Sequence, residues 1–117
     1  MRKYFYTLIF FVWASSVVWN ASHPSRLPPV DFPHFDKVAH TIYYIPGGYF
    51  AFLFLRIFGV ISVPLSFIFV SSVGFLDEFI QSLVPGREPS FLDIIADFLG
   101  AAIGILTARW RSKFGSF

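Results

Sequence analysis

The chain has 117 residues, enough for one domain, and its side chains are 56% hydrophobic but only 14% charged. A soluble domain usually carries about 25% charged residues, so this composition excludes an ordinary water-soluble domain and indicates insertion in a membrane. The formal net charge of the chain is +2. Its Lys and Arg residues lie at the ends of apolar stretches and form no basic stripe, so nucleic acid is not an expected partner. The absence of cysteine excludes disulfides, thiolate metal sites and cysteine nucleophiles.

Four apolar stretches approach or reach the roughly 20 residues that a helix needs to cross a bilayer. We therefore predict an all-α polytopic membrane protein, a single domain over residues 1–117, with transmembrane helices at about 4–19, 38–60, 61–84 and 91–110. The first stretch follows Arg2 and Lys3, which is also typical of a signal peptide. We favour a retained helix over cleavage after Ala21.

Residues of about 21–35 separate the first two helices and include four prolines. They show no helical period, which predicts an extended loop in water or among lipid headgroups. The distribution of Lys and Arg then predicts the orientation of the whole chain. With both termini in the cytoplasm, the cytoplasmic cations are Arg2, Lys3, Arg56, Arg109, Arg111 and Lys113, and the external ones are Arg26, Lys37 and Arg87.

Polar side chains recur at helical spacing on three of the four predicted helices. They are Asp36 and His40 on the second helix, Asp77, Glu78 and Gln81 on the third, and Asp93 and Asp97 on the fourth. Residues three or four apart share one helix face, and Gly100 and Gly104 continue the face of Asp97 with a spacing that permits close helix packing. Counting 1.5 Å per residue places Asp77 about 10 Å and Asp97 about 9 Å below the outer helix ends. We therefore expect one polar layer inside the bundle.

Carboxylates within a bilayer are costly, roughly 2.5–3.5 kcal/mol each at the centre of a helix. Such groups must pair with cations, share protons, bind a metal or face a wet cleft. Simpler structural roles also exist: Asp93 would cap the fourth helix, His40 would bond a neighbour, and Lys37 would anchor at the headgroups. Asp77, Glu78 and Asp97 are the residues hardest to explain without a functional site.

The polar strings resemble those of the VanZ-like family of small bacterial membrane proteins, of the teicoplanin-resistance type. They are Asp36-Lys37-Val38-Ala39-His40, Asp77-Glu78-Phe79-Ile80-Gln81 and Pro85-Gly86-Arg87, followed by Ser90, Asp93, Asp97, Gly100 and Gly104. The resemblance covers about residues 36–108 and implies a multi-pass protein of the bacterial cytoplasmic membrane, linked in one case to low-level glycopeptide resistance. Two positions depart from the family: Ile80 stands where His is frequent, and Asp97 where Asn is common.

Three functions remain open at this stage. In the first, an outward-facing polar cleft binds or handles an envelope lipid, a lipid-linked cell-wall precursor or a lipoglycopeptide, with Arg87 and Lys37 meeting phosphate or carboxylate. The ligand-binding residues expected for it are Asp36, His40, Asp77, Glu78, Gln81, Arg87, Asp93 and Asp97.

In the second, a membrane enzyme acts on lipid-phosphate headgroups with Glu78 or Asp97 as general base and His40 as general acid. Alternatively, a divalent cation held by Asp77, Glu78, Asp97 and His40 does this work. In the third, the polar layer only fixes the register of a helical bundle.

Overall fold

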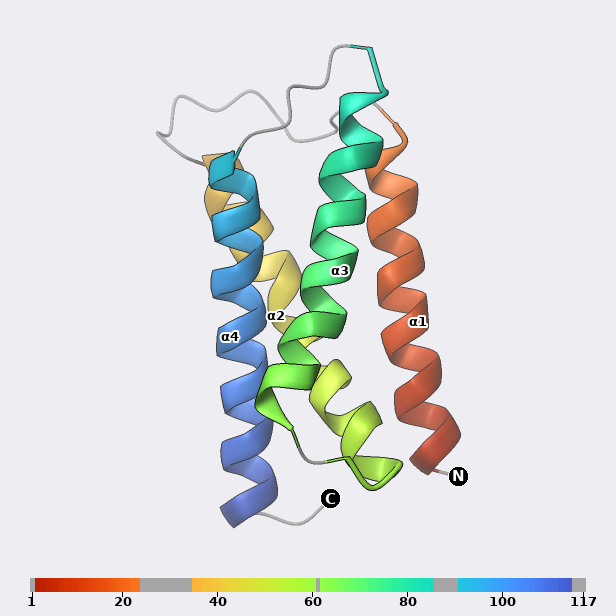
Figure 1. Ribbon diagram of the computed structural model, residues 1–117, viewed down its shortest axis with the longest axis vertical. Coiled ribbons are helices and arrows are strands. Elements are labelled where there is room, and N and C mark those ends of the chain that lie inside the picture. Colours follow the sequence, from red (N-terminus) through yellow and green to blue (C-terminus); the bar gives the residue numbers. More distant parts are fainter. Residues whose placement is uncertain (1, 24–34, 61, 86–90, 115–117) are drawn as a thin grey trace.

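The computed structural model describes residues 2–23, 35–60, 62–85 and 91–114. They form four helices, α1 (Arg2–Ala21), α2 (Phe35–Ile57), α3 (Val63–Ser82) and α4 (Phe91–Phe114), and no strand occurs among these residues. The start of α1 and the end of α4 lie at the same end of the bundle as the α2–α3 turn (Figure 1). Each helix is long and apolar enough to cross a membrane, which confirms the predicted all-α, four-span fold.

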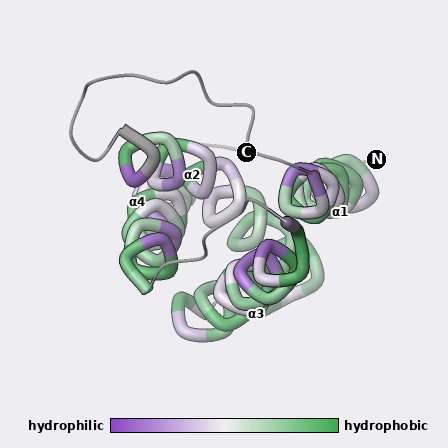
Figure 2. Tube along the Cα trace, turned by 90° about the horizontal axis from the view of Figure 1, so that it is seen from above, coloured by the Kyte–Doolittle hydropathy of each residue, from purple (hydrophilic) through white to green (hydrophobic). Residues whose placement is uncertain are grey.

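Helix α2 is the hub of the bundle. It packs against each of the other three helices, whereas α1 and α4 make no contact within the described ranges. Figure 2 shows α1 and α4 at opposite sides of the bundle. Side chains of α2 can therefore meet those of every other helix in a common site.

Glycines set the short distance between α2 and α4. A Cβ atom added at Gly100 would collide with the Thr41 carbonyl oxygen, and one added at Gly104 would collide with the Ile45 carbonyl oxygen. From the other side, Gly48 abuts the backbone of Ala101. The close approach expected from Gly100 and Gly104 is thus confirmed, and the two backbones are in direct contact.

The turn between α2 and α3 is sharper than the apolar pattern predicted. Gly59 has a φ of 88°, and the Val60 and Gly59 amides donate to the carbonyls of Leu55 and Arg56. This is the Schellman arrangement, which ends a helix with glycine in the left-handed region. Ser62 then caps α3 by accepting a hydrogen bond from the Leu65 amide at 3.1 Å. Helix α2 ends at Ile57 and α3 begins at Val63, a few residues from the predicted ends at about 60 and 61, because hydropathy counts apolar residues and does not register these caps.

The other helix ends also extend beyond, or stop short of, the apolar stretches. Helix α1 covers 2–21 instead of about 4–19, α2 begins at Phe35, α3 ends at Ser82, and α4 continues to Phe114. At the ends of α1, α2 and α4 the extra helical residues include polar ones, which hydropathy does not assign to hydrocarbon, whereas α3 stops before the apolar pair Leu83 and Val84. Most of the predicted loop, residues 24–34, and Ser90 lie outside the described residues.

Helix α1 is part of the core. Its Phe10, Trp13 and Val17 are buried, and the Trp13 Nε1–H donates to the Tyr43 carbonyl of α2 at 2.9 Å. The Trp13 ring covers Gly47, where a Cβ atom would overlap it. Cleavage after Ala21 would remove this part of the core.

The α2–α4 contact predicts the effect of a single methyl group. Gly104→Ala should destabilise the protein by about 1–3 kcal/mol, because the new Cβ has only backbone atoms to displace. The measurement is thermal unfolding in detergent. Gly74→Ala is the matched control, since its Cβ would meet nothing closer than 3.5 Å. Equal stability of the two variants would contradict the close packing of α2 on α4.

Candidate functional site

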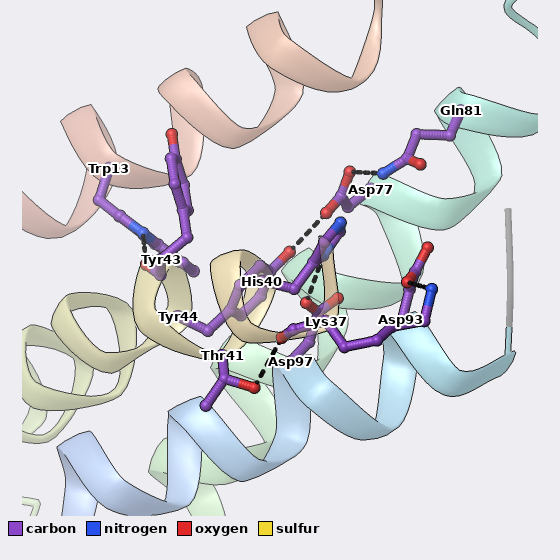
Figure 3. A network of polar contacts seen from close by, with 10 residues as sticks. All are labelled: Trp13, Lys37, His40, Thr41, Tyr43, Tyr44, Asp77, Gln81, Asp93 and Asp97. Carbon is purple, nitrogen blue, oxygen red and sulfur yellow. Dashed lines mark hydrogen bonds and ion pairs between the residues drawn. The ribbon is translucent and has the colours of Figure 1, made fainter. Parts of the chain in front are cut away.

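Polar side chains from α2, α3 and α4 meet at the end of the bundle where α2 and α4 begin and α3 ends (Figure 3). We call this group the polar layer. Its members are Lys37, His40, Tyr44, Asp77, Glu78, Gln81, Asp93 and Asp97.

The acids on α3 and α4 lie at one depth. Asp77 is about 7–8 Å from the end of α3 at Ser82, and Asp97 is about 9 Å from the start of α4 at Phe91, counting 1.5 Å per residue. Both are buried, as are Glu78 and Asp93, and Asp97 is only 1% exposed. The predicted convergence of these acids into one layer is confirmed, and none of the four faces the hydrocarbon.

Asp77 has both carboxylate oxygens occupied. The Tyr44 hydroxyl donates to Oδ2 at 2.9 Å, and the Gln81 side-chain amide donates to Oδ1 at 2.6 Å. These two donors hold the carboxylate in a single orientation. Gln81 was expected at the site, whereas Tyr44 was missed as a site residue, although its position four residues after His40 places it on the same face.

His40 and Asp97 connect α2 to α4. His40 Nδ1 lies 2.9 Å from Asp97 Oδ1. The contact is a hydrogen bond, and it becomes an ion pair when the imidazole is protonated. This bond fixes the ring orientation and favours the other ring nitrogen for a further partner. The second Asp97 oxygen, Oδ2, is buried and has no hydrogen-bond partner within the described part of the chain.

Lys37 and Asp93 form the edge of the layer. Their ammonium and carboxylate lie 2.6 Å apart, and the Lys37 side chain is 23% exposed. Asp93 also lies in the first turn of α4, where a negative charge is favoured by the helix dipole. Lys37 is therefore more than a headgroup anchor, because it neutralises an acid of another helix.

A tighter group lies within the layer. His40, Asp77, Glu78 and Asp97 each offer one possible ligand atom, and these four atoms lie within 4.8 Å of one another. These are the same four residues that the sequence singled out as possible ligands of a divalent cation. Their proximity is confirmed, while a catalytic role for Glu78, Asp97 and His40 stays a prediction.

A family model described as VanZ/LLP1 matches residues 1–112. The chain belongs to the VanZ/LLP1 family. The comparisons with curated proteins and with solved structures found no match. Together with the four membrane-span-like helices, the family match makes this a VanZ-like multi-pass membrane protein.

The VanZ/LLP1 match also includes α1, which lies before the strings that suggested the resemblance. Of the residues expected at the site, two cannot be placed in the layer. Asp36 lies in α2, but its side chain is outside the description, and Arg87 falls in residues 86–90, which the structure does not describe. Asp97, where Asn is common in the family, has a clear local role as the partner of His40.

Removal of one hydroxyl tests whether the layer is held as described. Tyr44→Phe should destabilise the protein by about 1–3 kcal/mol, because Asp77 Oδ2 stays buried without its donor. Thermal unfolding in detergent measures this loss. Tyr4→Phe is the control, since Tyr4 is 73% exposed on α1 and its change should leave stability the same. A neutral Tyr44→Phe would show that this hydrogen bond is not formed.

Proposed function

We propose that this VanZ/LLP1-family protein binds or handles, at the polar layer, the polar headgroup of an envelope lipid, a lipid-linked cell-wall precursor or a lipoglycopeptide. The observation that carries the proposal is a set of four buried acids inside helices whose outer faces are apolar. A headgroup attached to an acyl or polyprenyl chain has the same division into a polar and an apolar part.

Access to the layer supports a ligand that arrives from the membrane interface. Lys37 and His40 have side chains that are 23% and 17% exposed, while the acids behind them are buried. On the same helix, Val38 and Ile42 expose large apolar side chains. A lipid could therefore place its headgroup at Lys37 and His40 with its chain along the outer surface of α2.

The excess of acids in the polar layer favours a headgroup that carries hydroxyl or amino groups as well as phosphate. Asp77, Glu78, Asp93 and Asp97 outnumber Lys37 and His40, so the interior of the layer suits hydroxyls, amines or a cation. Phosphate would be met at the edge of the layer by Lys37, and Arg87, which lies outside the described residues, is the second cation that the sequence offers for it. Aminated or sugar-bearing headgroups fit this division better than simple anionic lipids.

The proposed location is the bacterial cytoplasmic membrane, with the polar layer toward the outside. Arg56, Arg109, Arg111 and Lys113 belong to the opposite end of the bundle, where cations favour the cytoplasmic face. Both termini would then be cytoplasmic. In this orientation the layer lies toward the outer leaflet, from which the proposed headgroup or lipoglycopeptide would reach it.

Headgroup binding gives the first test. Purified protein in detergent should bind a polyprenyl-pyrophosphate-linked wall precursor or an aminated phospholipid more tightly than phosphatidylglycerol, measured by native mass spectrometry. Lys37→Ala and Arg87→Ala should each weaken binding by about 10-fold, because each removes a charge-assisted hydrogen bond.

The matched control is Arg109→Ala, which removes a cation from the opposite end of the bundle and should bind as wild type does. Wild-type affinity in both Lys37→Ala and Arg87→Ala would refute the proposed phosphate contacts. The triple change Asp77→Asn, Glu78→Gln and Asp97→Asn separates binding from a purely structural layer. A folded, well-expressed triple variant that has lost binding would exclude the structural alternative.

A second function, hydrolysis of lipid phosphates, is favoured by one observation. His40 is oriented by Asp97 at 2.9 Å and belongs to the same group as Glu78, as a general acid and base would require. If the protein is an enzyme, His40→Gln should lower phosphate release from a lipid phosphate by about 10²–10⁴-fold. Ser72→Ala, whose hydroxyl bonds the Ile68 carbonyl of its own helix, is the control. Absence of phosphate release by the wild-type protein would refute this second function.

A further inference from the structure

The four residues His40, Asp77, Glu78 and Asp97 leave a problem of charge. Three carboxylates and one imidazole have ligand atoms within 4.8 Å of one another, and all three acids are buried. One imidazolium can neutralise only one of three carboxylates. Excess negative charge inside a membrane domain is costly unless a cation or protons compensate for it.

Asp97 provides an independent sign of a missing partner. Its side chain is 99% removed from solvent, and its Oδ2 atom is buried with no hydrogen-bond partner among the described residues. That atom lies on the α3 side of the layer, since it would be 3.5 Å from a Cβ built on Gly74. Asp77 and Glu78 come from the next turn of the same helix, so the orphaned oxygen faces the other two acids.

The neighbouring groups already hold the site in place. Tyr44 and Gln81 fix the Asp77 carboxylate, and an ion bound by His40 and Asp97 would take the place of the proton that these two side chains share at 2.9 Å. Hydrogen bonds to ligand side chains of this kind are typical of metal centres, where they orient the donors before the ion binds. Lys37 neutralises Asp93 separately and so leaves the four central residues with their own charge.

We propose that His40, Asp77, Glu78 and Asp97 bind one divalent transition-metal ion of the Mn²⁺ or Zn²⁺ class. A mixed set of one imidazole and three carboxylates suits these ions, whereas Mg²⁺ and Ca²⁺ prefer oxygen ligands alone. With bonds of about 2.1 Å, the ligands of a tetrahedral ion lie about 3.4 Å apart and opposite ligands of an octahedral ion about 4.2 Å. The four ligand atoms, which lie within 4.8 Å of one another, would therefore move together by roughly 1 Å when the ion binds. The bound ion would satisfy Asp97 Oδ2 and reduce the excess charge.

This inference rests on the proposed function only for its biological role, in which the ion links the carboxylates to a phosphate of the headgroup. The ion itself needs no lipid. Its binding can therefore be measured without any headgroup, which keeps the two proposals separate.

The experiment is a titration of chelator-treated protein with MnCl₂ in detergent that contains no phospholipid, followed by the electron paramagnetic resonance of free Mn²⁺. The expected result is one Mn²⁺ per chain, displaced by ZnCl₂ and not by an excess of MgCl₂, because affinity rises from Mn²⁺ to Zn²⁺ at a given site. Glu78→Gln and Asp97→Asn should each weaken binding by at least about 10-fold. Ser72→Ala should bind as wild type does, because its hydroxyl serves only its own helix.

Several results would overturn the inference. They are less than one ion per chain in the folded wild type, displacement by Mg²⁺ as readily as by Zn²⁺, or unchanged affinity in both Glu78→Gln and Asp97→Asn. Circular dichroism and gel filtration establish that the variants are folded, and the wild-type stoichiometry decides the matter if they are not. Headgroup binding that survives chelation would show that the ion takes no part in the proposed function, which would itself stand. One bound ion per chain in a protein that shows no headgroup preference would support the metal site and refute the proposed function.

Discussion

The structure depends on satisfying carboxylates that are buried inside a membrane bundle. Each of three acids finds a partner on another helix: Asp77 of α3 at Tyr44 of α2, Asp97 of α4 at His40, and Asp93 of α4 at Lys37. Since all three of these partners come from α2, the hydrogen bonds and ion pairs that satisfy the acids also fix α3 and α4 around that helix. In lipid, where apolar burial does not favour helix association, such polar contacts and close packing remain as the main forces.

Close packing and polar contacts reinforce one another in this bundle. Asp97 has a short side chain, and it reaches His40 because α2 and α4 approach until their backbones touch at Gly100 and Gly104. A larger residue at either glycine would separate the helices and lengthen that hydrogen bond. The glycines therefore act on the site through geometry, although they contribute no chemical group to it.

The polar layer is satisfied only in part. Among the described residues, both oxygens of Asp77 accept a hydrogen bond, whereas Asp97 keeps one buried oxygen without a partner, and the acids exceed the cations around them. A layer that served packing alone would gain stability by neutralising this excess. The same imbalance motivates both the headgroup proposal and the metal-ion proposal, since either ligand would supply groups that the described part of the chain does not place there.

The sequence by itself determined the membrane class, the four helices and the identity of most site residues. Hydropathy reports burial in hydrocarbon, and the spacing of Asp93 and Asp97 or of Glu78 and Gln81 fixes which side chains share a helix face. It could not place the helix ends at Gly59 and Ser62, where local backbone geometry decides. Only the tertiary structure paired His40 with Asp97 and Tyr44 with Asp77 and left Asp97 Oδ2 unsatisfied, because these distances depend on how far the glycines let α2 approach α4 and on how α3 packs beside them.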